Sequence, residues 1–210
     1  MKTLVIGANG QIGRMVCAKA RERGLDVRAM VRSSEQAARF EQEQIESVIG
    51  DLEGDFGHAL DGCEQVVFTA GSGPHTGPDK TLMVDLYGAM RTTDEARKRK
   101  LRRVIMVSAL RVSNLMDAPE KLRPYLVAKL AADHYLHTSG VPSLILRPGR
   151  LTDEPSTHRI RTLLGDGPNT ISRENVAEVI VEALPRIDLV GSVIDLLDGD
   201  RPISEVLAAG

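Results

Sequence analysis

Three glycines spaced three residues apart, directly after the first apolar run, constrain the fold more than any other feature. The run Lys2–Ile6 has the composition of a buried strand, and Gly7-Ala8-Asn9-Gly10-Gln11-Ile12-Gly13 leads from it into a helical pattern. In such a unit the first glycine permits a tight turn, the second lets the backbone approach a pyrophosphate, and the third lets helix and strand pack closely. The helix N-terminus then favours bound phosphate. We therefore predict a dinucleotide site at Gly7, Asn9, Gly10, Gln11, Ile12 and Gly13.

The rest of the chain alternates β-rich runs with helical patterns, which is typical of a parallel sheet covered on both faces. Strands are expected at 2–6, 26–31, 46–49, 65–69, 103–108, 143–147 and 192–197, and helices at 11–23, 35–43, 79–100, 124–138 and 173–184. Right-handed crossovers give a doubly wound parallel sheet of about seven strands in an α/β fold. We predict one NAD(P)-binding Rossmann domain over residues 1–210, with substrate-side loops at 74–78, 111–122 and 151–170.

Local signals refine these helices. The longest helical pattern shares an apolar face at three-to-four spacing, made by Leu82, Leu86, Ala89, Thr93 and Ala96. Gly24 is expected to end the first helix, because a helix terminus often needs a residue with positive φ. Ser172 is expected to cap the helix at 173–184.

Composition excludes several classes of function. The net charge is -2 and aromatic residues make up 3% of the chain, so we expect no nucleic-acid partner. The basic run Arg97–Arg103 is interpreted as the solvated end of a helix. No stretch approaches the roughly 18 apolar residues of a membrane span, and the chain opens on a strand pattern without a signal peptide. We therefore expect a cytoplasmic protein without a membrane partner.

Neither a disulfide framework nor a metal site is expected. Cys17 and Cys63 lie far apart in the sequence without a Cys-x-x-Cys pairing, and we interpret them as small buried side chains of a cytosolic protein. His134 and His137 share a helix face, but no third ligand stands nearby. No feature of the sequence indicates a particular oligomeric state.

The end of the second predicted strand bears on the choice of cofactor. NAD-binding versions of this unit place an acidic residue there to hold the ribose 2′-hydroxyl. This chain has Arg32, followed by two serines, and a guanidinium suits a 2′-phosphate. A solvated arginine is the alternative, but we predict NADP(H) over NAD(H). Asp51 and Leu52 are expected beside the adenine, and Ala70, Gly71 and Ser72 beside the middle of the cofactor.

Tyr125 and Lys129 place a phenol and an ammonium one helical turn apart on the same face. The lysine favours phenolate and can hold the nicotinamide ribose, so Tyr125 can act as a general acid or base. Ser108, at the end of the fifth predicted strand, can hydrogen-bond a reacting carbonyl. A surface pair at i,i+4 is the alternative for Tyr125 and Lys129. His75 is either a proton donor to substrate or an exposed loop histidine.

Ser108, Tyr125 and Lys129, in this order behind the glycine turn, resemble the short-chain dehydrogenase/reductase superfamily. Nearly the whole chain is similar to its atypical branch, the NmrA-like and epimerase/dehydratase-type proteins that include small flavin and biliverdin reductases. Further segments that carry the likeness are 71–81, Leu146-Arg147-Pro148-Gly149 and 171–177. The resemblance implies that Pro148, Gly149, Arg150 and Leu151 lie beside the nicotinamide. It also implies that Asp85, near the substrate, replaces a typical Asn and lacks its amide donor.

We therefore predict an NADP(H)-dependent oxidoreductase that transfers hydride from NADPH to a small conjugated or carbonyl acceptor. By resemblance, this small-molecule substrate is flavin- or tetrapyrrole-like. Two alternatives stay open. One is a non-catalytic NADP(H)-sensing regulatory protein of NmrA type, which would bind a protein partner. The other is an epimerase or dehydratase that uses NAD(P) transiently, although the lack of a large substrate domain disfavours a sugar nucleotide.

Overall fold

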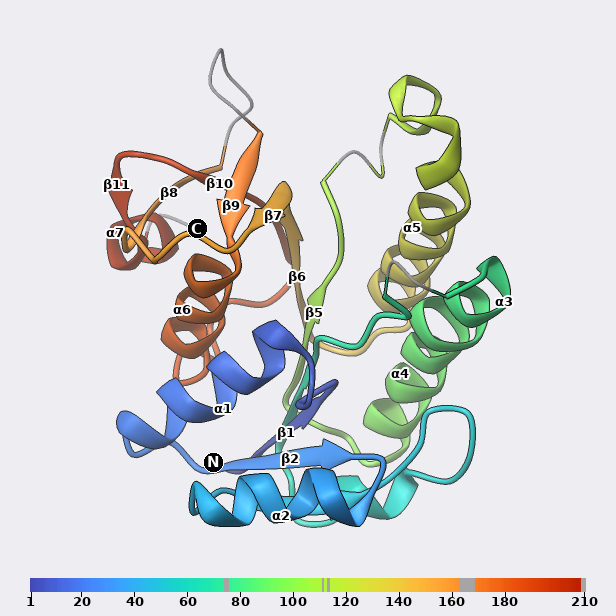
Figure 1. The fold of residues 1–210 in the computed structure, drawn as a ribbon, viewed down its shortest axis with the longest axis vertical. Coiled ribbons are helices and arrows are strands. Elements are labelled where there is room, and N and C mark those ends of the chain that lie inside the picture. Colours follow the sequence, from blue (N-terminus) through green and yellow to red (C-terminus); the bar gives the residue numbers. More distant parts are fainter. Residues whose placement is uncertain (74–75, 111, 113, 163–168, 209–210) are drawn as a thin grey trace.

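The computed structural model describes residues 1–73, 76–110, 112, 114–162 and 169–208. Within these residues, nine strands form one sheet in the order β11-β8-β10-β6-β5-β4-β1-β2-β3 (Figure 1). The stretch from β10 to β3 is parallel, and the short β8 and β11 extend it antiparallel beyond β10. The strand bounds are β1 Thr3–Ile6, β2 Val27–Val31, β3 Glu46–Ile49, β4 Gln65–Phe68, β5 Arg103–Val107, β6 Ser143–Pro148, β8 Arg159–Arg161, β10 Ser192–Asp198 and β11 Arg201–Pro202.

The predicted doubly wound sheet is confirmed, since all the strands expected from the sequence are present and parallel. From β1 the chain first builds outward through β2 to β3, and then returns to β4 on the other side of β1. The order therefore reverses between β1 and β4. The sequence did not predict β8 and β11, because strands of two or three residues are too short to show a hydrophobic period. It also missed a separate parallel pair, β7 Arg150–Thr152 and β9 Thr170–Ser172.

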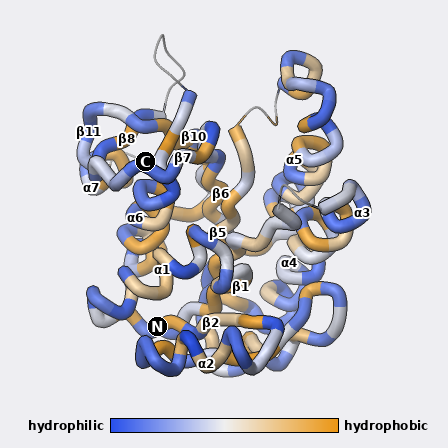
Figure 2. The backbone as a smooth tube through the Cα atoms, viewed as in Figure 1, coloured by the Kyte–Doolittle hydropathy of each residue, from blue (hydrophilic) through white to orange (hydrophobic). Residues whose placement is uncertain are grey.

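Helices cover both faces of the sheet (Figure 1). One face carries α1 Gln11–Glu22, α2 Ser34–Gln42, α6 Arg173–Ala183 and α7 Ile203–Ala208, and the other carries α4 Ala89–Lys98, α5 Arg123–Thr138 and the 3-10 turn η1 Gly57–Leu60. Successive strand residues point to opposite faces, so Val5 and Val67 pack in the first layer while Leu4 and Phe68 pack in the second. Figure 2 shows the resulting apolar centre between more hydrophilic outer surfaces.

Two predictions about helix ends are confirmed, one at the end of α1 and one at the start of α6. Gly24 follows α1 with a φ of +69°, a conformation that costs a residue with a Cβ about 1 kcal/mol or more. The Ser172 hydroxyl accepts a hydrogen bond from the Asn175 N–H at 3.0 Å and so caps α6.

The long helix expected at 79–100 is not continuous. It consists of α3 Pro78–Lys80, the π-helical segment η2 Thr81–Gly88, and α4. A π-helix bonds residues five apart and so takes more residues per turn than an α-helix. The prediction that Leu82 is buried is therefore wrong: it is 54% exposed, and Asp85 is buried instead. Beyond the π segment the expected face holds, with Ala89, Thr93 and Ala96 buried.

The basic run at 97–103 is also only partly solvated. Arg103 begins β5 and is fully buried, so its interpretation as part of a solvated helix end is wrong. Its guanidinium donates to the Ala183 carbonyl at 2.8 Å and to Gln65 Oε1 at 2.8 Å. It therefore binds carbonyl groups at the C-terminal end of α6, where cations are favoured.

The cysteines and the two histidines of α5 can also be placed in the structure. Cys17 and Cys63 are both free and buried, while His134 and His137 are exposed. Among the described residues, no cluster of three His, Cys, Asp or Glu side chains could hold a metal ion. In that same part of the chain, no helix has the length and apolar character needed to cross a membrane.

Candidate functional site

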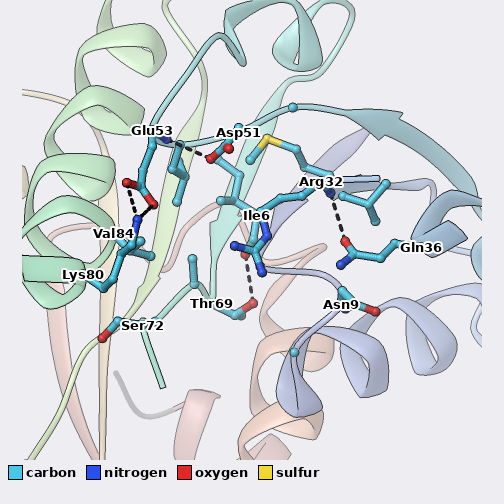
Figure 3. Close-up of a pocket in the computed structure, with 18 of the residues that line it drawn as sticks. Ile6, Asn9, Arg32, Gln36, Asp51, Glu53, Thr69, Ser72, Lys80 and Val84 are labelled. Carbon is cyan, nitrogen blue, oxygen red and sulfur yellow. Dashed lines mark hydrogen bonds and ion pairs between the residues drawn. The ribbon is translucent and has the colours of Figure 1, made fainter. Parts of the chain in front are cut away.

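A cavity of about 390 Å³ opens at the carboxyl ends of β1, β2, β3 and β4 (Figure 3). It lies where the strand order reverses, which is where open α/β sheets bind their ligands. The loops after these strands supply most of its lining. Of the predicted cofactor residues, the cavity is lined by Gly7, Asn9, Gly10, Arg32, Asp51, Leu52, Ala70, Gly71 and Ser72.

The glycine turn forms the floor of this cavity. Gly7 has a φ of +82°, and a Cβ there would lie 2.5 Å from the Ala70 nitrogen. A Cβ on Gly13 would lie 2.3 Å from the Gly7 carbonyl oxygen. Gly10 is the N-cap of α1, whose first turn has neither a capping side chain nor an acidic residue. The amides that open α1 are therefore left for an anion, and the turn fits a pyrophosphate.

An arginine on α1, Arg14, lies beside the glycine turn. The guanidinium of Arg14 donates to Asn9 Oδ1 at 2.7 Å, and Asn9 lines the cavity. Sequence reasoning missed Arg14. The signal for it was its place one helical turn after Gly10, beside the phosphate site.

Arg32 follows β2 and is exposed. Its backbone N–H donates to Gln36 Oε1 at 2.9 Å, and the Ser33 hydroxyl caps α2. Figure 3 shows the guanidinium turned toward the middle of the cavity. No carboxylate in the described residues forms an ion pair with it. The positive charge at this end of the cavity is therefore free to meet an anionic ligand group.

An ion pair that the sequence did not predict closes the opposite side of the cavity. Lys80 Nζ, from α3, donates to both carboxylate oxygens of Glu53 at 2.8 Å (Figure 3). The Glu53 backbone N–H donates in turn to Asp51 Oδ1 at 3.0 Å. Lys80 and Glu53 lie far apart in the sequence, and both side chains are partly exposed. No local sequence pattern therefore predicts that they form an ion pair.

None of the predicted catalytic residues, Ser108, Tyr125 and Lys129, belongs to the described lining of this cavity. Lys129 Nζ is buried, donates to the Val107 carbonyl at 2.8 Å and lies 3.9 Å from Asp85 Oδ1. Asp85, expected near the substrate, is itself buried and accepts a hydrogen bond from the Ser72 N–H at 2.9 Å. It therefore connects the cavity loop after β4 to Lys129. Tyr125 is half-buried against the small apolar cluster that contains Leu126.

Ser108 is buried next to Asp133, a residue that sequence reasoning did not single out. Neither the Ser108 hydroxyl nor Asp133 Oδ1 has a partner with hydrogen-bond geometry among the described residues. Asp133 Oδ2 accepts from Arg147 Nε at 3.0 Å. Burial raises the pKa of Asp133, although the nearby Ser108 hydroxyl and the Arg147 guanidinium act to lower it.

The electrostatics around Tyr125 differ from the expectation that Lys129 favours its phenolate. Burial, followed by the negative charges of Asp85 and Asp133, raises the pKa of Tyr125. Burial lowers the pKa of Lys129, although the negative charges of Asp85 and Asp133 act to raise it. The expectation considered Lys129 alone and included neither the burial of Tyr125 nor the two carboxylates, Asp85 and Asp133.

The remaining predicted residues lie elsewhere at the carboxyl edge of the sheet. Gln11, Ile12 and Gly13 form the first turn of α1, and Pro148 ends β6. Gly149, Arg150 and Leu151 follow it, and the last two pair with β9. A Cβ on Gly149 would lie 2.5 Å from the Asn169 carbonyl oxygen, so this glycine permits close packing. His75 lies outside the described residues, as do parts of all three predicted loops.

Comparisons with known proteins agree with this architecture. Residues 7–186 match the NAD(P)H-binding family. The chain is 42% identical over 211 residues to YhfK of Bacillus subtilis, named as an uncharacterized sugar epimerase, and the match covers 99% of both proteins. A Bacillus halodurans structure, provisionally named an NAD-dependent epimerase/dehydratase, is 39% identical with a TM-score of 0.95 and full coverage of both chains.

A more distant structure shares the fold. ChuY, named as an anaerobillin reductase from Escherichia coli O157:H7, is 22% identical with a TM-score of 0.79, covering 95% of this chain and 98% of its own. Together with the match over residues 7–186, these comparisons confirm the resemblance drawn from the glycine turn and from Ser108, Tyr125 and Lys129. The chain belongs to the NAD(P)H-binding family of the atypical short-chain dehydrogenase/reductases.

Proposed function

We propose that this protein is an NADP(H)-dependent oxidoreductase that passes hydride from NADPH to a small conjugated or carbonyl acceptor. The cavity carries the proposal: a glycine turn suited to a pyrophosphate lies opposite Arg32, at the position where NAD-preferring proteins place an acidic residue. A guanidinium there favours the 2′-phosphate of NADP over the bare hydroxyl of NAD. When bound, the cofactor supplies the hydride.

In this proposal, residues of the chain bind the cofactor, orient the loop after β4 and donate a proton to the acceptor. The amides that open α1 bind the pyrophosphate, Arg32 binds the 2′-phosphate, and Leu52 packs against the adenine. Asp85 orients the loop after β4 through its hydrogen bond from the Ser72 N–H. Tyr125, whose pKa is raised by burial and by the nearby carboxylates, then donates the proton that accompanies hydride transfer. The name of ChuY supports a tetrapyrrole-like acceptor.

One observation favours the non-catalytic alternative. Ser108 and Lys129 are both buried, and the Lys129 ammonium donates to a backbone carbonyl, so neither side chain faces the cavity. A protein that only senses NADP(H) would need the cavity but no proton donor. A further alternative is epimerase chemistry, to which the names of the two Bacillus relatives point. An epimerase also needs a residue that exchanges protons with the substrate.

Replacement of Tyr125 separates catalysis from sensing. Loss of NADPH absorbance would be followed with carbonyl, flavin and bilin acceptors, for wild type, Tyr125→Phe and the control Tyr135→Phe. Tyr135 lies on the same helix but donates to Asp94, away from the site. We expect Tyr125→Phe to slow acceptor reduction by about a hundredfold, a typical contribution of general acid catalysis, and Tyr135→Phe to leave it unchanged. If NADPH binds but no acceptor oxidises it, the sensing alternative holds.

A further inference from the structure

Two side-chain amides line the end of the cavity at β2. Asn9 belongs to the glycine turn, and Gln36 lies in the first turn of α2. Figure 3 shows both at the same end of the cavity as Arg32, across from the ion pair of Lys80 and Glu53. An amide can offer a ligand either its acceptor oxygen or its two N–H donors, so its orientation decides what it can bind.

The orientation of Asn9 is fixed by Arg14. The Asn9 oxygen Oδ1 accepts from the Arg14 guanidinium at 2.7 Å. A guanidinium has donors and no acceptor, so the amide atom that meets it must be the oxygen. Arg14 is itself held at its backbone, where its N–H donates to the Gly10 carbonyl at 2.9 Å as α1 begins. The NH2 group of Asn9 is therefore the one left for the cavity.

Gln36 is fixed in the same sense by the start of α2. Its Oε1 accepts from the Arg32 backbone N–H at 2.9 Å, and its own backbone N–H donates to the Ser33 hydroxyl that caps the helix. The arrangement is similar to a capping box, in which a side chain three residues after the cap reaches back to a free backbone donor. A backbone N–H can only donate, so the Gln36 NH2 group is likewise left for the cavity.

Both of these NH2 groups lack a protein acceptor. Among the described residues, neither Asn9 Nδ2 nor Gln36 Nε2 donates a hydrogen bond. The carboxylates in the described lining of the cavity, Asp51 and Glu53, come from the loop after β3, and none comes from β2 or α2. Together with the Arg32 guanidinium, this end of the cavity therefore offers donors without a carboxylate beside them.

Such a set of donors suits a phosphate better than a ribose hydroxyl. An ionised phosphate presents acceptor oxygens, and hydrogen bonds to such charged oxygens are stronger than neutral ones. A hydroxyl also carries a proton, for which NAD-binding proteins supply a carboxylate. The donors at the end of β2 therefore match the one group that distinguishes NADP from NAD, its 2′-phosphate.

We propose that Asn9 and Gln36 bind the 2′-phosphate of NADP(H) through their NH2 groups, and that Arg14 is a positioning residue that acts through Asn9. This inference rests on the proposed function and adds to Arg32 two neutral binding residues and one residue behind them. The choice of cofactor then depends on the direction in which each amide points, besides the charge of Arg32. A carboxylate in place of either amide would keep the internal hydrogen bond but present an acceptor to the cavity.

Calorimetric titrations with NADPH, NADH, adenosine 2′,5′-bisphosphate and 5′-AMP test the two amides. Gln36→Glu is the sharpest variant, because its carboxylate can still accept from the Arg32 N–H. We expect it to bind NADPH and the bisphosphate about tenfold or more weakly, through loss of a hydrogen bond to a charged group, and to keep its affinity for NADH and 5′-AMP. Gln42→Glu adds the same charge at the exposed end of the same helix and should behave as wild type.

A double-mutant cycle tests the role of Arg14. Arg14→Met, Asn9→Ala and the double variant would be titrated with the same ligands. If Arg14 acts through Asn9, Arg14→Met should weaken NADPH binding by about fivefold in wild type and add little in the Asn9→Ala background. Arg21→Met removes an exposed arginine near the other end of α1 and should leave binding unchanged.

Three outcomes would overturn the inference. In one, wild type binds adenosine 2′,5′-bisphosphate no more tightly than 5′-AMP, a result that needs no variant to fold. In another, folded Gln36→Glu weakens NADPH and NADH binding equally, or weakens neither. In the third, Arg14→Met weakens NADPH binding by the same factor with and without Asn9, which would contradict a role that acts through Asn9.

These titrations need no acceptor, so the inference and the proposed function can fail separately. If the affinities change as expected but no acceptor oxidises NADPH, the oxidoreductase proposal fails and the roles of Asn9, Gln36 and Arg14 stand. If an acceptor oxidises NADPH but Gln36→Glu keeps the wild-type preference for NADPH, the inference fails and the oxidoreductase proposal stands.

Discussion

At the scale of single residues, the site depends on glycines whose missing side chains leave room for backbone. A Cβ on Gly13 would lie 2.3 Å from the Gly7 carbonyl oxygen, so Gly13→Ala must push the turn away from α1. We expect a loss of about 2 kcal/mol in the free energy of unfolding, within the range for overpacked sites, and weaker NADPH binding. Urea denaturation and calorimetry would measure the two effects.

Gly24, which lies at the other end of α1 and outside the cavity lining, provides the control for this prediction. Unlike Gly13 it adopts positive φ, and a Cβ there would meet no atom within 4 Å. Gly24→Ala should cost about 1 kcal/mol of stability through backbone strain and leave NADPH binding unchanged. Equal NADPH affinities in the two variants would show that the glycine turn does not form the binding site.

The residues of the site differ in how far the sequence could predict them. Gly7, Gly10 and Arg32 follow strands in a local pattern, and all three line the cavity. Lys80 and Glu53 could not be predicted, because their ion pair joins separate loops without a motif. The charges near Tyr125 escaped prediction for another reason. A sequence shows that Lys129 lies one turn from Tyr125, but not that two carboxylates are buried with it.

At the scale of secondary structure, Arg103 joins β5 to the C-terminal end of α6. Its guanidinium donates to the carbonyls of Ala183 and Leu184 and to Gln65. Arg103→Met would leave these buried acceptors without a donor, which we expect to cost about 3 kcal/mol in the free energy of unfolding. Arg102→Met, the control, removes an exposed ion pair with Glu64 and should cost less than about 1 kcal/mol. Similar losses in both variants would contradict the bridging role of Arg103.

The elements that the sequence predicted are those with a long, regular hydrophobic period. Every expected strand and helix is present, although the helix at 79–100 changes to π geometry between Thr81 and Gly88. A pattern search at 3.6 residues per turn cannot detect such a change, and so it assigned Leu82 to the core. Asp85, which the predicted apolar face did not include, is buried within the same segment.

At the scale of the whole molecule, the doubly wound sheet brings the loops after four neighbouring strands around one cavity. The sequence predicted this arrangement because parallel strands with right-handed crossovers leave few topologies. It did not predict β8 and β11, at the edge of the sheet opposite β3, or the separate β7–β9 pair. None of these four strands supplies a residue to the described lining of the cavity. The central claim is therefore that this cavity binds NADP(H) through the glycine turn and Arg32.

Calorimetric titration with NADPH and NADH tests that claim most directly, for wild type, Arg32→Ala and the control Arg39→Ala, an exposed arginine on α2. We expect wild type to bind NADPH more tightly than NADH. Loss of a charge-assisted contact should weaken NADPH binding by about tenfold or more in Arg32→Ala and leave NADH binding unchanged. Arg39→Ala should behave as wild type. No binding heat from either cofactor, or equal affinities that Arg32→Ala does not alter, would contradict the account.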